Sequence, residues 1–303
     1  MRLVSYRLGQ GAARLGVEKG DMLVDVERLG ARAGLPFPSD MLGFIDMGPT
    51  ALAALGGLLA DADPALMVGT AFPAGNATLL APIPRPRKNI FGIGLNYTEH
   101  VAESARALDT AVELPQEPVI FSKPPTAVIS GTDSIRHNAA VTQQMDWETE
   151  LAVVIGATAH AVSEEDALSH VFGYTIINDI SARDCRRSGQ WIVSKGQDTY
   201  APMGPCIVTA DEIPDPQALD LWTLVNGVEK QRSNTRFMLF SVRELIADIS
   251  KVMLLEPGDI IATGTPAGVG AGRDPQEFMW PGDVVESHVE KIGRLRNPIV
   301  AAE

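Results

Sequence analysis

Two glutamates that stand two residues apart, Glu148 and Glu150, are the first feature of this sequence that could do chemistry. Residues 151–155 after them are apolar and mostly β-branched, which predicts a buried strand. On a strand, side chains i and i+2 share a face, so both carboxylates would point into the same space. Like charges that close raise each other's pKa, and a hard cation such as Mg²⁺, Mn²⁺ or Ca²⁺ would relieve the repulsion. The alternative is a solvated glutamate face on an edge strand.

A third carboxylate, Asp179, ends another apolar stretch, residues 173–179. A strand that ends on an aspartate presents that side chain at the rim of a β core. With Glu148 and Glu150, Asp179 gives three carboxylates on neighbouring strands. This set suits a divalent cation that keeps open positions for water.

A candidate general base lies upstream of these carboxylates. His100 and Glu103 are three residues apart in a segment that can be helical from Tyr97, so they would share one face of the helix. A glutamate beside a histidine raises the basicity of the imidazole and fixes its tautomer, as activation of water requires. The alternative is an exposed pair on an ordinary surface helix. The polar segment 104–117 predicts a mobile loop that can serve as a lid.

Cationic residues follow the carboxylates. Arg183, Arg186 and Arg187 place positive charge beside them, and arginine binds carboxylates through a planar bidentate fork. Lys195 lies in a loop-like stretch, where it either contacts substrate or is a solvated lysine. The glycine-rich residues 257–270 could bring backbone N–H groups near an anion, but they form no Walker or dinucleotide motif.

The composition limits the possible partners. Acidic residues outnumber basic ones 38 to 25, giving a net charge of −13, which argues against nucleic acid and anionic membranes. An anionic substrate would therefore need a local cation or metal. Cys185 and Cys206 are too few for a disulfide framework and predict reduced thiols. The sequence shows neither an apolar signal segment nor a membrane span, so we expect a cytoplasmic protein.

The elements that must position these residues fall into two parts. Residues 1–80 predict a small α+β domain, with short strands up to residue 27 and a helix near 50–62. A Pro/Gly-rich stretch, 70–86, is the predicted boundary, and residues 85–303 form the second domain. There the sequence predicts a helix opening at Ser163, a tight hairpin at Asn226-Gly227 and an amphipathic helix over 241–251.

Six motifs between residues 89 and 299 together resemble the fumarylacetoacetate hydrolase (FAH) superfamily, in its bacterial hydrolase or isomerase form. They are Gly94-Leu-Asn-Tyr-x-x-His-x-x-Glu103, Asp146-x-Glu-x-Glu-Leu-Ala-x-Val-Ile-Gly156, Gly173-Tyr-x-x-x-Asn-Asp-x-Ser-Ala-Arg-Asp184, Lys195-Gly-x-Asp-x-x-x-Pro-x-Gly-Pro205, Val225-Asn-Gly-x-x-x-Gln231 and Pro257-Gly-Asp-x-Ile-x-Thr-Gly-Thr-Pro-x-Gly-Val-Gly270. The resemblance implies an α+β, β-rich fold, with a rolled mixed β-sheet core and flanking helices behind a small N-terminal α+β domain. It also implies a homodimer.

The resemblance assigns roles to the candidate residues. The implied Mg²⁺ or Mn²⁺ ligands are Glu148, Glu150 and Asp179; the implied catalytic residues are His100, Glu103 and Lys195; the implied substrate-binding residues are Arg183, Arg186, Gly264 and Thr265. Two departures stand out. Some members place a metal-binding aspartate near the position of Asn96, and the usual pattern has glutamine where this chain has Arg186.

The resemblance implies a metal-dependent hydrolase that cleaves a C–C bond of a 2,4-diketo acid through a metal-bound enolate. The substrate would be a small anionic 2-oxo acid, of the acylpyruvate or 3-deoxy-2,4-diketo sugar acid type. The alternative is an isomerase or decarboxylase of a 2-oxo-dioate, such as 2-hydroxyhepta-2,4-diene-1,7-dioate or oxaloacetate. A third possibility is a non-catalytic binder of metal or 2-oxo acid. The pair His100 and Glu103 argues against it, because a binder needs no base.

Overall fold

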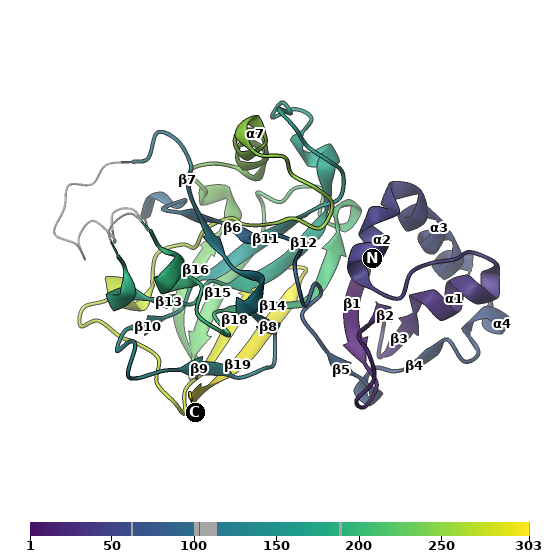
Figure 1. The fold of residues 1–303 in the computed structure, drawn as a ribbon, viewed down its shortest axis with the longest axis horizontal. Coiled ribbons are helices and arrows are strands. Elements are labelled where there is room, and N and C mark those ends of the chain that lie inside the picture. The colour runs from purple at the N-terminus through teal and green to yellow at the C-terminus, as the bar shows by residue number, and fades with distance from the viewer. Residues whose placement is uncertain (62, 100–102, 104–113, 188–189, 303) are drawn as a thin grey trace.

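The structure is a computed structural model, and it describes residues 1–61, 63–99, 103, 114–187 and 190–302. As predicted, its architecture is α+β and rich in strands, with mixed sheets and few helices (Figure 1). The largest sheet has 12 strands. They are β4 (Ala71–Pro73), β3 (Met22–Asp25), β2 (Arg14–Lys19), β1 (Arg2–Arg7), β14 (Ala201–Thr209), β12 (Val171–Asn178), β11 (Thr149–Ile155), β17 (Ile260–Ala262), β6 (Ile90–Gly94) and β7 (Val119–Lys123), in this order, with β5 (Thr78–Leu79) beside β1 and β8 (Val128–Ser130) beside β14.

The centre of this sheet is buried on both faces. Every residue of β11 and of β12 is buried, which agrees with their continuous apolar and β-branched sequences. The two strands run antiparallel, and their register places Thr149 opposite Asn178. Parallel pairs, such as β17 with β6, make the sheet mixed. The central strands therefore form a rigid support for the residues at their ends.

A second sheet packs against the first. Its strands are, in order, β16 (Val228–Asn234), β15 (Asp220–Val225), β18 (Val284–Val289), β19 (Gly293–Ala301) and β9 (Ile135–His137). The predicted hairpin is confirmed: Asn226 and Gly227 have φ values of 52° and 77°, in the left-handed region that its tight turn requires. Thr149 joins the two sheets, because its hydroxyl lies 2.6 Å from the hydroxyl of Thr223.

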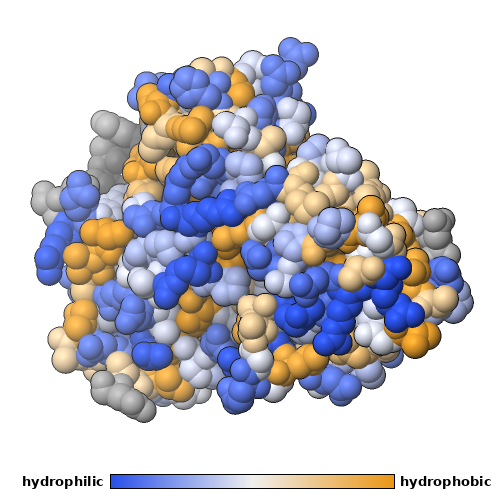
Figure 2. Space-filling model, turned by 45° about the vertical axis from the view of Figure 1, so that its right-hand side comes forward, coloured by the Kyte–Doolittle hydropathy of each residue, from blue (hydrophilic) through white to orange (hydrophobic). Residues whose placement is uncertain are grey.

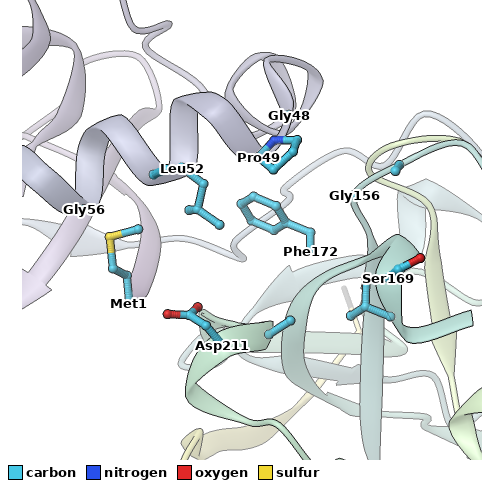
Figure 3. Close-up of a pocket in the computed structure, with 13 residues that line it drawn as sticks. Met1, Gly48, Pro49, Leu52, Gly56, Gly156, Ser169, Phe172 and Asp211 are labelled. Carbon is cyan, nitrogen blue, oxygen red and sulfur yellow. The ribbon is translucent and has the colours of Figure 1, made fainter. Parts of the chain in front are cut away.

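The N-terminal part lies to one side of the core (purple to blue in Figure 1). Its described residues form the helices α1 (Val26–Ala33), α2 (Met41–Asp46), α3 (Gly48–Asp61) and α4 (Pro64–Met67). Its strands extend the large sheet, since Leu3 of β1 pairs with Ile207 of β14. A cleft of about 390 Å³ runs between α3 and the core, and Leu52 and Phe172 face it from either side (Figure 3). The domain boundary at residues 80–85 stays a prediction.

Two helical predictions had different outcomes. The amphipathic helix is confirmed as α7 (Val242–Val252), which Ser241 and Glu244 begin with a reciprocal capping box. The helix predicted to open at Ser163 is wrong: residues 163–166 form a turn, followed by the 3₁₀ helix Ala167–His170. The Ser163 hydroxyl accepts the N–H of Asp166 at 3.1 Å, which closes a local turn in place of an α-helical start.

The part of the chain that the structure describes contains no helix that is both long and apolar enough to cross a bilayer. Hydrophilic and hydrophobic residues are interspersed over the face drawn in Figure 2. Three further elements lie near the site: β10 (Met145–Asp146) pairs with β13 (Ser181–Ala182), and the short helix α6 (Ile192–Lys195) follows them.

Candidate active site

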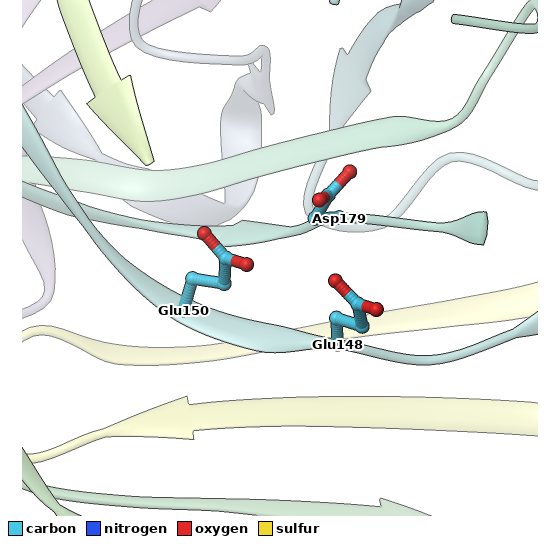
Figure 4. Close-up of side chains that lie close together, drawn as sticks. All are labelled: Glu148, Glu150 and Asp179. Atoms are coloured by element: carbon cyan, nitrogen blue, oxygen red, sulfur yellow. The ribbon is translucent and has the colours of Figure 1, made fainter. Parts of the chain in front are cut away.

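Three carboxylates meet where the central strands end. Glu150 belongs to β11, Glu148 directly precedes that strand, and Asp179 directly follows β12. The antiparallel pairing brings these ends together, and the N–H of Asp179 donates to the carbonyl oxygen of Glu148 at 2.8 Å. One oxygen from each carboxylate lies within 4.8 Å of one from each of the others. Figure 4 shows both glutamates rising from one strand toward Asp179, so the chain has an acidic, buried metal-binding triad.

Two buried lysines compensate part of this negative charge. The ammonium of Lys195 lies 2.6 Å from Glu148 and 2.6 Å from Asp179. The ammonium of Lys123 donates to the other oxygen of Asp179 at 2.5 Å. Burial lowers the pKa of Lys123, although Asp179 opposes this. Burial also disfavours the charge on Lys195, but Asp179 and Glu148 outweigh it and raise the pKa of Lys195.

The third cation, Arg183, links the triad to a loop. Its Nη2 lies 2.7 Å from Glu148, and its Nε donates to Asp146 at 2.8 Å. Asp146 also accepts the N–H groups of Gly270 and Ala271, at 2.7 and 3.0 Å. The oxygens of Asp146 are therefore occupied by the guanidinium and by the loop. This explains why the acidic cluster consists of the two glutamates and Asp179 without Asp146.

Glu150 differs from the other two carboxylates. Within the described part of the chain it has no ion pair with a lysine or arginine, and its carboxylate accepts the N–H of Gly264 at 2.9 Å. Burial, with the charges of Asp179 and Glu148, raises the pKa of Glu150 well above its usual range. Three converging carboxylates, one of them uncompensated, fit a hard divalent cation such as Mg²⁺ or Mn²⁺.

The loop after β17 is shaped by close packing. Gly264 has a φ of +97°, and a Cβ there would lie only 2.7 Å from Cβ of Asn96, so this position requires glycine. The hydroxyl of Thr265 donates to the carbonyl oxygen of Thr149 at 3.0 Å and accepts from Gln231 at 2.8 Å. These bonds fix the loop beside the triad. Sequence reasoning found Thr265 but assigned no role to Gln231, which is the residue that orients it.

Asn96 holds neighbouring loops together. Its amide nitrogen donates to the carbonyl oxygens of Phe240 and Thr263, at 3.0 and 2.8 Å. Its oxygen accepts the N–H of Phe240 at 2.7 Å. Asn96 is the position near which some family members place a metal-binding aspartate. In this chain its side chain is fully buried and hydrogen-bonded to the backbone.

The predicted general-base pair is placed only in part. Glu103 is buried, and its two carboxylate oxygens lie 3.0 and 3.1 Å from the N–H of Gly268, which donates to them. A Cβ at Gly272 would lie 2.1 Å from the carboxyl carbon of Glu103, so the glycine-rich loop forms a close-fitting cradle for this side chain. His100 lies outside the described residues. The dyad stays a prediction, and so does the lid predicted over residues 104–117, of which 104–113 also lie outside the described part.

A small pocket lies beside Glu148, one member of the triad. Its lining brings together five predicted site residues with four others: Glu148, Arg183, Arg186, Lys195 and Thr265, then Ile93, Gly94, Leu95 and Trp191. Its volume is about 30 Å³, which is space for about one water molecule. From the sequence, no site role was assigned to Trp191 or to Lys123. The sequence around Lys123 offered one sign of its place: this lysine ends an apolar strand, just before two prolines.

The comparison with known families agrees with this site and fold. The family model described as "Fumarylacetoacetate (FAA) hydrolase C-terminal" matches residues 89–300. The chain therefore belongs to the fumarylacetoacetate hydrolase family, as the six motifs predicted. The family is one of enzymes that act on oxo acids.

Two relatives are named for the same activity. Over 222 residues the chain is 46% identical to oxaloacetate tautomerase YisK of Bacillus subtilis strain 168, covering 73% of this chain and 72% of that protein. Over 306 residues it is 39% identical to the mitochondrial oxaloacetate tautomerase fahd2 of Xenopus laevis, covering 99% of this chain and 90% of that protein. Tautomerisation is a kind of isomerisation. These two relatives therefore support the isomerase alternative more than the hydrolase that we first expected.

A solved structure with a similar fold contains a divalent metal and a 2-oxo acid. The chain is similar to maleylpyruvate hydrolase from Sphingobium sp. SYK-6 in complex with manganese(II) ion and pyruvate. The TM-score is 0.77 at 31% identity, and the match covers 100% of both chains. The fold is thus shared over the full chain, and one relative with this fold has been seen with a divalent metal and a 2-oxo acid.

Proposed function

We propose that this protein is a divalent-metal-dependent tautomerase that interconverts the enol and keto forms of an oxaloacetate-type 2-oxo acid. The observation that carries the proposal is the buried cluster of Glu148, Glu150 and Asp179 with Lys195 inside it. Such a cluster can bind a metal and an anionic oxygen together. The two relatives named oxaloacetate tautomerases supply the reaction class.

The metal is Mg²⁺ or Mn²⁺ in this proposal, and Glu148, Glu150 and Asp179 would hold it. When bound, it would supply a Lewis acid that stabilises negative charge on the substrate's oxygens. Lys195 and Arg183 contribute on the protein's side. Lys195 is held by Glu148 and Asp179, so its ammonium is fixed beside the place where charge develops.

The reaction itself needs only a proton shift. In the enol-to-keto direction the O–H bond at C2 breaks and a C–H bond forms at C3, with no gain or loss of atoms. We assign the proton transfer to His100, oriented by Glu103; the sequence predicts this pair as a general base that activates water. Glu103 can do this because the N–H of Gly268 fixes its carboxylate in a buried cradle. A fixed partner keeps an imidazole in one tautomer.

The test is a tautomerase assay on the purified protein. Oxaloacetate is supplied as the enol, and the loss of enol absorbance is followed with Mg²⁺, with Mn²⁺ and after exhaustive chelation. We expect acceleration with either metal and none after chelation. An unchanged enol lifetime in the presence of both metals would refute the proposal. Formation of pyruvate and CO₂ instead would assign the decarboxylase alternative.

Hydrolysis of a C–C bond is the second candidate. The similarity to a maleylpyruvate hydrolase of the same fold favours it, since that reaction also acts on a 2-oxo acid. Here His100 would remove a proton from water, and the resulting hydroxide would attack the second carbonyl group. A panel of acylpyruvates and diketo sugar acids, assayed for released pyruvate, separates the two reactions. Light scattering on the purified protein tests the predicted homodimer.

A further inference from the structure

Arg183 begins a short helical turn and Arg186 directly follows it. Residues Arg183–Cys185 form a 3₁₀ helix, and the N–H of Arg186 donates to the carbonyl oxygen of Arg183 at 3.4 Å. In this kind of helix, side chains three residues apart lie one above the other. The turn therefore brings the second guanidinium to the same pocket as the first, and both line it.

A platform of aromatic rings fixes the second guanidinium. The Arg186 guanidinium lies over the ring of Trp191, 4.6 Å from its centroid. Trp191 packs on Phe121, with ring centroids 5.3 Å apart. On its other side a Cβ at Gly94 would lie 2.6 Å from the Trp191 ring, so the indole rests directly on the backbone of β6. An arginine stacked in this way retains its N–H edge for a ligand.

The two arginines differ in their partners. Arg183 is neutralised by Asp146 and Glu148, at 2.8 and 2.7 Å. Arg186 has no ion pair among the residues that the structure describes, and it is exposed at the mouth of the pocket. Glu148 of the acidic triad and Lys195 line the same pocket, and both are buried. An unpaired guanidinium outside an inner anion site is suited to bind a second negative group of the same ligand.

We propose that Arg186, held on Trp191, binds the distal carboxylate of the substrate and so makes the enzyme selective for dianionic 2-oxo acids. This inference rests on the proposed function, in which the first carboxylate and the 2-oxo group bind at the triad. The planar fork of Arg186 matches a carboxylate in two parallel hydrogen bonds. A monoanionic substrate of the same size leaves this fork without a partner.

The test compares two substrates and three variants. Oxaloacetate and acetylpyruvate both enolise between C2 and C3, but acetylpyruvate has a methyl ketone where oxaloacetate has its second carboxylate. Arg186→Gln should lower kcat/KM for oxaloacetate about 10- to 100-fold, the usual loss for a charge-assisted hydrogen bond. It should change acetylpyruvate less than about threefold. Arg186→Lys should fall in between, because lysine keeps the charge without the fork.

Arg187→Gln is the matched control. Arg187 is the next residue, is exposed and does not line the pocket, so this variant should keep the wild-type substrate ratio. Equal losses on both substrates in Arg186→Gln would overturn the inference while leaving the tautomerase proposal intact. If wild type turns over neither substrate, binding to the Mg²⁺-loaded protein is measured by calorimetry instead. The inference then stands only if wild type binds oxaloacetate more tightly than acetylpyruvate and if Arg186→Gln removes this difference.

Discussion

Replacing the two triad glutamates with glutamine should have opposite effects on the stability of the metal-free protein. Glu150 is buried and has no cationic partner among the described residues, whereas Glu148 pairs with Lys195 and Arg183. Glutamine has nearly the same shape as glutamate and keeps an oxygen for the N–H of Gly264. Glu150→Gln therefore removes an unfavourable buried charge, but Glu148→Gln leaves two buried cations with less compensation.

The magnitudes follow from these partners. At pH 8 the charge on Glu150 costs on the order of 1–3 kcal/mol, the range for a poorly compensated buried polar group. The melting temperature of metal-free Glu150→Gln should then rise by about 2–6 °C, at about 2 °C per kcal/mol for a chain this long. Glu148→Gln should lose about 3 kcal/mol, as when one partner of a buried ion pair is removed. Both variants should bind Mn²⁺ about 100-fold more weakly, or about 2.8 kcal/mol.

The effect of Glu150 should depend on pH with a defined sign. Its pKa in the folded protein lies above the ordinary value of 4.5, so the folded state holds the proton more tightly than the unfolded state. The metal-free wild type therefore loses stability as the pH rises above about 4.5 through the folded pKa. Glutamine cannot titrate, so the advantage of Glu150→Gln should shrink toward pH 5.

Thermal unfolding of chelator-treated protein at pH 5 and pH 8 measures these effects, and Mn²⁺ titration calorimetry measures the affinities. The heat of Mn²⁺ binding should depend on the buffer more in wild type than in Glu150→Gln, because binding displaces any proton that Glu150 holds and glutamine has none to release. If both variants lose stability equally at pH 8, the charge assignment is wrong, because it requires opposite signs.

Three further substitutions test other parts of the structure. Lys195→Met should lower turnover at least about 100-fold while Mn²⁺ still binds in calorimetry, because all three carboxylates remain; loss of metal binding as well would contradict this. Gly272→Ala should reduce kcat with little change in metal affinity, since its Cβ would lie 2.1 Å from the Glu103 carboxyl carbon. Asp25→Asn should cost about 1–3 kcal/mol in urea unfolding without changing kcat, because buried Asp25 accepts hydrogen bonds from Arg14 and Tyr6 far from the site.

The parts of the site that sequence could predict are those that follow from local periodicity. Glu148 and Glu150 are two residues apart beside an apolar run, and a strand places such side chains on one side. Asp179 follows from the same logic, because it ends the neighbouring antiparallel strand. The hairpin at Asn226 and Gly227 was predictable because its turn demands positive φ values. Each inference needed only a few consecutive residues.

The contacts that sequence could not predict join residues that are far apart in the chain. Lys123 contacts Asp179 across 56 positions, and its own strand indicates only that an apolar segment ends there. Trp191 meets Arg186 and Gly94 only because three separate segments converge on one pocket. The prediction of a helix at Ser163 failed for a different reason. The Ser163 hydroxyl accepts the N–H of Asp166 in a local turn, and a 3₁₀ helix follows in place of an α-helix.

The balance of charge in the inner cluster explains why metal and substrate should bind in sequence. The described residues of this cluster are four carboxylates and three cations: Asp146, Glu148, Glu150 and Asp179 with Lys123, Lys195 and Arg183. With Glu150 ionised, the cluster carries one excess negative charge, in a protein whose net charge is −13. It should therefore repel a 2-oxo acid. A divalent cation reverses the sign of the cluster, so the metal becomes the condition for binding the anionic substrate as well as for its chemistry.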